Sequence, residues 1–204
     1  MSPVTSELHS MSRRQQILTS AETVLKDKGI EGFTMDLVVK HAEIAKGTAY
    51  KYFKSKDEIL AVISARALEM LLHDFEKGAA KESNYTAKIR SICFSAYRFY
   101  VRHKAYWNLI SYMERPEFEI DIKDYIRISQ ELQDFCEDII ETGKSRGEIR
   151  TDLPTREGQL VLWASCVGVV QFLESKKRIL RNVHNISLEG MISTYADMIT
   201  KGIS

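Results

Sequence analysis

Apolar residues recur at helical spacing through almost the whole chain, and few residues interrupt the pattern. The 204 residues include only three prolines and ten glycines, and long stretches contain neither. Glycine and proline are frequent at turns, so a chain this poor in both is unsuited to a turn-rich β architecture. Apolar side chains three and four residues apart lie on one face of a helix. The sequence therefore predicts an all-α fold.

The expected helices end where glycine, proline or a short polar segment breaks the periodicity. After a loose tail over residues 1–11, helices are expected over about 13–28, 56–78, 84–103, 105–113, 118–146, 155–176 and 186–201, in addition to the two short ones described next. Capping boxes, Ser12 with Gln15 and Ser55 with Glu58, are expected to begin two of them. We expect one domain over residues 1–55 and a second over 56–204.

The segment from Phe33 to Lys56 has the pattern of two short helices joined by a tight turn. Thr34 is a good N-cap for the first helix, because its hydroxyl can accept a hydrogen bond from an amide of the first turn. In the second helix Ala49 and Phe53 stand four residues apart and are expected to point inward. The opposite face then carries lysine, threonine and tyrosine side chains outward. This arrangement is typical of a helix-turn-helix that places its second helix in a DNA groove.

The charge of this segment supports the same interpretation. From Leu37 to Lys56 there are five lysines and one glutamate, a local net charge of +4 in a chain whose total is +1. A basic patch on a near-neutral protein indicates contact with nucleic acid. Tyrosine and threonine hydroxyls can bond to phosphates or base edges, and Gly47 allows a close backbone approach. A solvated charged face is the alternative, and the helix-turn-helix spacing with interleaved tyrosines favours DNA.

The run A-K-G-T-A-Y-K-Y-F-K-S-K-D-E-I-L resembles the recognition helix and following segment of the TetR family of bacterial transcriptional regulators. The resemblance covers about the first quarter of the chain, and the connector from Gly147 to Pro154 resembles the loop before the last two helices of that family. It implies an N-terminal DNA-binding domain and a C-terminal domain for effector binding and dimerisation. Major-groove contacts are implied for Lys46, Gly47, Thr48 and Tyr50, phosphate contacts for Thr34, Tyr52 and Lys56, and Lys51 belongs to the same exposed set.

Two residues depart from the family pattern. The turn position that usually holds glycine is Glu43, and the usual serine at the N-cap of the recognition helix is Ala45. A residue with a side chain in the left-handed turn conformation costs about 1 kcal/mol, and an alanine cap forfeits about as much. Phosphate would also repel a glutamate this close to DNA. We expect these departures to affect turn geometry and affinity and to leave the fold unchanged.

Residues 155–176 are apolar almost all round, which indicates a helix buried on both sides. A C-terminal domain of this size has difficulty covering such a helix alone. We expect it to pack, together with 186–201, against the same helices of a second subunit. A two-fold dimer also presents two recognition helices to a palindromic site. A monomer with a well-covered core is the alternative.

The family resemblance also implies a small effector held among the C-terminal helices. The candidate wall residues are Tyr97, Tyr100, Trp107, Tyr125, Ser129, Leu132, Trp163 and Gln171. Residues of these types at helical spacing are more often core residues than ligand contacts. Because no arginine or lysine lies in the inward stripes, the sequence predicts a mainly apolar or aromatic effector.

Other classes of function have weaker support. The five histidines lack metal-ligand spacing, and we find neither a glycine-rich phosphate loop nor a nucleophile elbow, so no enzyme activity, metal or cofactor is expected. A helical protein-interaction module, whose basic patch meets an acidic partner, remains an alternative. The three cysteines are widely spaced, the N-terminus has no signal-peptide pattern, and no apolar run is long enough to cross a membrane, so we expect a soluble cytoplasmic protein.

Overall fold

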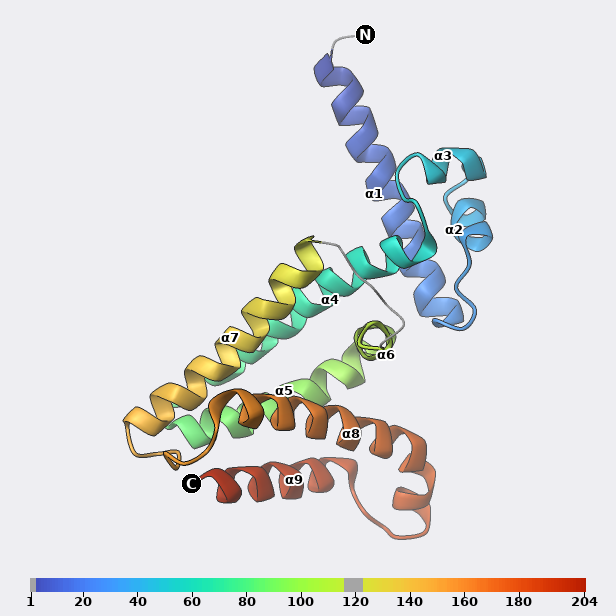
Figure 1. Cartoon of the computed structure of the whole chain (residues 1–204). Coiled ribbons are helices and arrows are strands. Elements are labelled where there is room, and N and C mark those ends of the chain that lie inside the picture. Colours follow the sequence, from blue (N-terminus) through green and yellow to red (C-terminus); the bar gives the residue numbers. More distant parts are fainter. Residues whose placement is uncertain (1–2, 116–122) are drawn as a thin grey trace. The chain divides into compact units, whose positions relative to one another are not determined.

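The computed structural model describes residues 3–115 and 123–204, with side chains from residue 12 onward. All regular elements in this part of the chain are α-helices, which confirms the predicted all-α fold (Figure 1). The helices are α1 (Pro3–Lys28), α2 (Met35–His41), α3 (Lys46–Tyr50), α4 (Lys56–Ala79), α5 (Tyr85–Arg102), α6 (Lys104–Met113), α7 (Lys123–Ser145), α8 (Thr155–Asn182) and α9 (Leu188–Ile203).

The chain divides into two compact units. The first comprises Met1–Ala67 and Ala105–Ile126, and the second comprises Leu68–Lys104 and Arg127–Ser204. Helix α4 therefore contributes its first half to one unit and its second half to the other. The boundary predicted between residues 55 and 56 separates two expected functions, DNA binding and effector binding, and it stays a prediction.

In the first unit, α1 packs across α2 and α3 and supplies much of their core. Ile17, Leu18 and Leu25 of α1 are fully buried, as is Val38 of α2. The side-chain amide of Gln16 donates a 2.8 Å hydrogen bond to the carbonyl of Ala42, where α2 ends. Apolar burial and this hydrogen bond together hold the turn between α2 and α3 against α1.

Helix α1 begins at Pro3, so the expected loose tail over 1–11 and helix start at 13 were wrong. Proline is favoured in the first turn of a helix, and neither glycine nor proline follows it before residue 29. The capping box expected at Ser12 therefore lies inside the helix. Gln15 instead donates to the Thr19 hydroxyl at 3.3 Å and accepts from Arg66 at 2.9 Å.

The second capping box does begin a helix, as expected. The hydroxyl of Ser55 accepts a hydrogen bond from the Glu58 amide at 3.1 Å, at the start of α4. The carboxylate of Glu58 reaches back to the amide of Lys54 at 2.6 Å. Both bonds satisfy backbone donors that a helix start leaves without partners.

The second unit is built from the second half of α4 with α5, α7, α8 and α9. Helices α8 and α9 run side by side (Figure 1), and the Tyr195 hydroxyl of α9 lies 2.7 Å from the Ser165 hydroxyl of α8. Gly147 follows the end of α7 at φ +70°, the left-handed conformation that glycine adopts without strain. The three cysteines are free and buried, as expected of core residues.

Some helix ends differ from the expected ones. Helix α8 continues to Asn182, past the expected end at 176, because neither glycine nor proline interrupts residues 169–182. The expected first residues of the seventh helix, 118–122, lie outside the described residues. The described part of α7 runs from Lys123 to Ser145.

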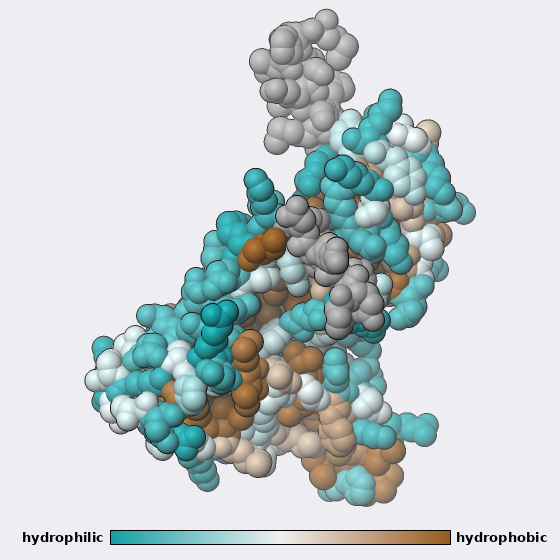
Figure 2. Space-filling model, viewed as in Figure 1, coloured by the Kyte–Doolittle hydropathy of each residue, from teal (hydrophilic) through white to brown (hydrophobic). Residues whose placement is uncertain are grey.

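Within one chain, α8 buries one side and exposes apolar residues on the other. Leu162, Cys166 and Val170 are buried, whereas Val161 is 63% exposed and Phe172 is 48% exposed. We call Leu160, Val161, Phe172 and Ile179 the α8 stripe, because all four are large, apolar and exposed. Figure 2 shows apolar side chains gathered over this part of the molecule. The described helices include none long and apolar enough to span a membrane.

Candidate functional site

Helix α3 presents polar groups outward because two apolar side chains anchor it from behind. Ala49 is fully buried and Phe53 is 1% exposed, as the four-residue spacing predicted. Tyr50 is 46% exposed on the other face. A Cβ built at Gly47 would meet no atom within 4 Å, so the backbone there is open to a close approach.

Thr34 caps α2 as expected, and its hydroxyl accepts a 3.3 Å hydrogen bond from the Leu37 amide. Helix α2 ends in a Schellman-type turn. The Ile44 amide donates to the Val39 carbonyl at 3.1 Å, and the Glu43 amide donates to the Lys40 carbonyl at 3.3 Å. This pair of hydrogen bonds requires the residue before Ile44 to adopt the left-handed conformation.

Glu43 occupies that left-handed position with φ +52°. Glycine would adopt this conformation without a steric penalty, whereas a residue with a Cβ is strained there. Ala45 stands at the N-cap of α3 in an extended conformation and has no side-chain oxygen to accept an amide hydrogen. The helix-turn-helix forms despite both departures because the core behind it is well packed.

Lys46, the first residue of α3, forms an ion pair with Asp36 of α2. Its ammonium nitrogen lies 2.7 Å from the carboxylate oxygen, and both side chains are more than half exposed. The hydrogen bond from Lys46 to Asp36, followed by the charge of Asp36, raises the pKa of Lys46. This pair could not be predicted from the sequence, because the two residues are ten positions apart on different helices.

The remaining predicted DNA contacts lie in the same segment. Gly47 and Lys51 are exposed, and Thr48, Tyr52 and Lys56 are partly exposed. Arg14 of α1 lies over the Phe53 ring, with its guanidinium carbon 4.9 Å from the ring centre. We call the helix-turn-helix from Thr34 to Lys56 the head. It carries hydroxyl and cationic groups at the N-cap of α2, along α3 and at the start of α4.

This geometry agrees with the sequence comparisons. Residues 17–63, from the middle of α1 into α4, match the family described as "Bacterial regulatory proteins, tetR family". The helix-turn-helix segment of the chain thus matches this family. The chain is 36% identical over 83 residues to the uncharacterized HTH-type transcriptional regulator YfiR of Bacillus subtilis (strain 168), a match that covers 41% of this chain and 40% of YfiR. The relatives that it matches are named as regulators of transcription.

Longer matches are weaker in sequence. The HTH-type transcriptional repressor KstR2 of Mycolicibacterium smegmatis is 22% identical over 145 residues, which is 70% of each chain. The transcriptional regulator FadR of Bacillus subtilis, solved in complex with stearoyl-CoA, superposes with a TM-score of 0.73 at 17% identity and covers 93% of this chain and 99% of that one. This likeness shows that the tetR-type fold extends through the C-terminal helices. The chain spans about two-fifths to three-fifths of the length of the first curated relatives that it matches.

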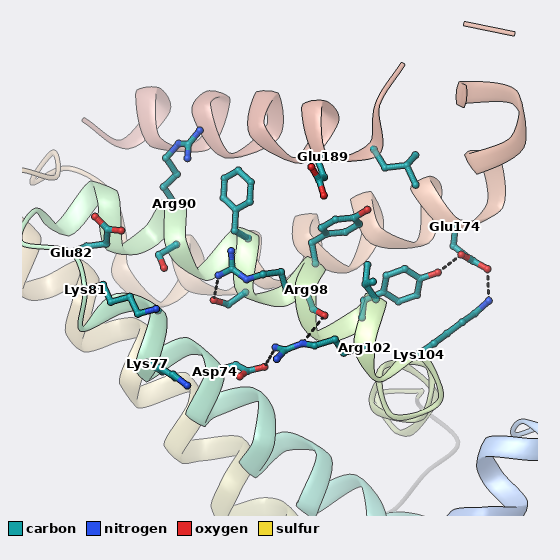
Figure 3. A pocket seen from close by; sticks show the side chains of 18 of the residues that line it. Asp74, Lys77, Lys81, Glu82, Arg90, Arg98, Arg102, Lys104, Glu174 and Glu189 are labelled. Atoms are coloured by element: carbon teal, nitrogen blue, oxygen red, sulfur yellow. Dashed lines mark hydrogen bonds and ion pairs between the residues drawn. The ribbon is translucent and has the colours of Figure 1, made fainter. Parts of the chain in front are cut away.

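The second unit contains an open groove of about 1120 Å³ between α4, α5, α8 and the start of α9. Eight basic and four acidic side chains line it, a net charge of +4. We call it the basic groove. Figure 3 shows Lys77 near the end of α4, Lys81 just after it and Arg98 on α5, on facing walls of this groove.

One carboxylate organises part of the wall of the basic groove. Glu174 of α8 accepts hydrogen bonds from the Tyr100 hydroxyl and the Lys104 ammonium (Figure 3). Lys177 adds a third contact at 3.2 Å. The hydrogen bond from Lys104 and then the one from Tyr100 lower the pKa of Glu174 to about 2. Burial is the main cause that raises the pKa of Tyr100.

The predicted effector residues do not form one cluster. Tyr97 and Tyr100 line the basic groove. Leu132 and Trp163 line a separate cavity of about 10 Å³, close to the space that one water needs. Ser129 is half-buried and Gln171 is exposed, and Trp107 and Tyr125 belong to the first unit. Which of these residues contact an effector stays a prediction.

Sequence reasoning missed the polar groups nearest to these hollows. Gln159 is 3% exposed and lines the small cavity, and within the described residues its side-chain oxygen has no hydrogen-bond partner. The cations of the basic groove were missed because they lie outside the inward stripes. Charged residues that converge from separate helices leave no local pattern in a sequence.

Proposed function

We propose that this chain is a ligand-responsive repressor that binds a palindromic operator as a homodimer and leaves it when a small effector binds. The observation that carries the proposal is the exposed face of α3. Ala49 and Phe53 are buried behind it, so its hydroxyls and cations are exposed on the opposite face, where DNA could contact them. The proposed DNA contacts are Thr34, Lys46, Gly47, Thr48, Tyr50, Lys51, Tyr52 and Lys56.

The α8 stripe supports a dimer. Large exposed apolar residues in a row mark a surface that another protein covers. Gly168 lies within the stripe, and a Cβ placed there would meet no atom within 4 Å, so a second helix could approach closely. We propose that α8 and α9 pack against the same helices of a second subunit. One two-fold axis then relates the two heads.

The effector is proposed to bind in the second unit and to have a mainly apolar or aromatic body. Tyr97, Tyr100, Leu132 and Trp163 supply apolar surface with polar tips there. Ser129 and Gln171 belong to the same unit and to the proposed set, whereas Trp107 and Tyr125 belong to the first unit and stay sequence predictions. FadR of Bacillus subtilis, which has a similar fold, was solved with stearoyl-CoA, and this is consistent with an effector that has a large apolar part.

Fluorescence anisotropy on the DNA that flanks the chain's own gene tests the proposal. A scrambled duplex of equal length is the control, at low and at physiological salt. A specific regulator keeps its preference for one sequence at physiological salt, whereas a generic basic patch loses affinity for both duplexes alike. If both duplexes bind equally and lose affinity with salt, the titration is repeated with other genomic fragments. The same result with those fragments would favour a protein-interaction module instead.

A further inference from the structure

We propose that the basic groove binds the phosphate-bearing end of an effector whose other end is apolar. This inference rests on the proposed function, in which a small molecule controls DNA binding, and it names the chemical class of that molecule. The groove lies wholly within the second unit.

The first argument is the surplus of cations. Arg102 pairs with Asp74 at 2.6 Å, Lys104 and Lys177 share Glu174, and Arg90 pairs with Asp197 at 2.9 Å. By contrast, in the ranges that the structure describes, the remaining basic side chains of the groove take part in no ion pair with a carboxylate. These are Lys77, Lys81, Arg98 and Arg181.

Three of these unpaired cations line the groove from neighbouring segments. Lys77 lies near the end of α4 and Lys81 just after it, and Arg98 comes from α5, where its guanidinium donates a 3.0 Å hydrogen bond to the Ser95 hydroxyl (Figure 3). Unpaired cations that line one groove raise its positive potential, which favours the binding of an anion there. Guanidinium and ammonium groups are the usual partners of phosphate oxygens in proteins. Glu82 and Glu189 also line the groove, and its net charge of +4 includes them.

The second argument is the apolar surface beside these cations. The ring of Phe94 and the side chains of Tyr97 and Leu188 line the same groove. A second hollow of about 350 Å³ shares Tyr97 and Leu188 and continues to Ile186. A molecule with phosphates at Arg98 and an apolar chain along Tyr97 would use both surfaces.

Size supports the same class of ligand. The volume of about 1120 Å³ is slightly above that of most small-molecule sites, which usually measure roughly 300–1,000 Å³. Inorganic phosphate would leave most of this space and all of the apolar surface unused. We therefore infer a phosphate-bearing amphiphile.

Isothermal titration calorimetry with the full chain tests the inference. The probe is octanoyl-coenzyme A, which joins three phosphates to an apolar chain, and the comparison ligands are coenzyme A, octanoate and inorganic pyrophosphate. We expect octanoyl-coenzyme A to bind at least tenfold more tightly than each of the other three. Equal affinity for octanoate, or absence of octanoyl-coenzyme A binding, would overturn the proposal. Equal affinity for pyrophosphate would reduce the site to an anion site and would also overturn it.

Paired variants locate the binding site. Lys81→Gln with Arg98→Gln removes two unpaired cations and is expected to weaken octanoyl-coenzyme A binding about tenfold or more. Arg156→Gln with Lys201→Gln removes the same charge from exposed positions of the second unit outside the groove, and is expected to change affinity less than threefold. Equal losses in the two double variants would overturn the proposal. Glu174→Gln releases Lys104 and Lys177 and is expected to tighten binding several-fold, and thermal melts check that each variant is folded.

DNA anisotropy separates this inference from the proposed function. Lys81→Gln with Arg98→Gln should bind the operator like wild type while it loses its response to octanoyl-coenzyme A. If wild type binds the operator specifically and octanoyl-coenzyme A does not bind, the inference fails and the regulator stands. If octanoyl-coenzyme A binds in the groove and operator affinity is unchanged, the site stands and its role as the effector site fails.

Discussion

The ammonium of Lys46 is held 2.7 Å from the Asp36 carboxylate in the free helix-turn-helix. Lys46 is the residue expected to contact a base. The Asp36 carboxylate of α2 therefore pairs with the same ammonium group that would bind DNA. Both side chains are well exposed, and such pairs contribute little to stability. The main effect of the ion pair is therefore that Asp36 competes with DNA for the Lys46 ammonium.

Asp36→Asn is expected to tighten operator binding about threefold to tenfold at low salt, because it frees Lys46 and removes a charge that phosphate repels. Anisotropy titrations measure the change. Asp27→Asn is the matched control, since it removes an exposed carboxylate from the end of α1. Unchanged affinity for Asp36→Asn would mean that Lys46 does not contact DNA.

Lys46→Ala and Lys56→Ala should differ in kind. If Lys46 reads a guanine edge, its loss costs about 1–3 kcal/mol and relaxes the preference at that base pair. Lys56 is expected to contact phosphate, so its loss should weaken binding evenly across sequences and lower the salt slope by about one unit. Titrations against a set of single-base operator variants separate the two patterns, and wild-type behaviour in both mutants would contradict this assignment of the head.

Glu43→Gly is expected to stabilise the head by up to about 1 kcal/mol, because glycine adopts the left-handed conformation at residue 43 without strain. The greater freedom of glycine in the unfolded chain offsets part of this gain. Urea unfolding measures the difference. Glu31→Gly, which removes the same charge from an exposed loop position, should not stabilise, and an equal gain there would point to charge as the cause.

Val161→Asp and Phe172→Asp are expected to convert the dimer to a monomer, because each buries a carboxylate in the proposed interface. Light scattering coupled to gel filtration gives the mass. Ile126→Asp changes another exposed apolar residue, 51% exposed on α7, and should leave the mass unchanged. A wild-type mass in both α8 variants would exclude the α8 stripe as the interface.

The stability of the second unit should depend on pH through Glu174. Its pKa is lowered to about 2 in the folded chain from an ordinary value of 4.5, so the ionised form is favoured by folding. The contribution is complete above pH 4.5 and is lost as the pH falls toward 2. Urea midpoints of wild type and Glu174→Gln should therefore differ at pH 7 and converge near pH 2, and a constant difference would contradict the assignment.

The parts of this fold that follow local rules could be predicted from the sequence. The buried pair Ala49 and Phe53, the Thr34 cap and the strained Glu43 all depend on residues within a few positions of one another. The same rules failed at Ser12, where a valid capping pattern lies inside α1. A capping box indicates where a helix can begin, but a longer helix overrides it when nothing upstream interrupts the chain.

The basic groove could not be predicted in this way. Lys77, Arg98 and Arg181 belong to three helices, and each alone has the spacing of an ordinary solvent-facing residue. Their convergence depends on how α4, α5 and α8 pack. The search for an effector site along inward stripes found Tyr97 and Tyr100 of this groove and missed the cations beside them.

If the α8 stripe is the dimer interface that we propose, it links the folding of each copy to the number of copies that a cell holds. With the stripe covered by a partner, unfolding must also separate the pair, so the melting temperature should rise with protein concentration. At low protein concentration the proposed dimer would dissociate, and a single head would have to bind its half-site without the second head. Repression would then switch on over a narrow range of protein number, which sets a threshold that depends on expression as well as on effector.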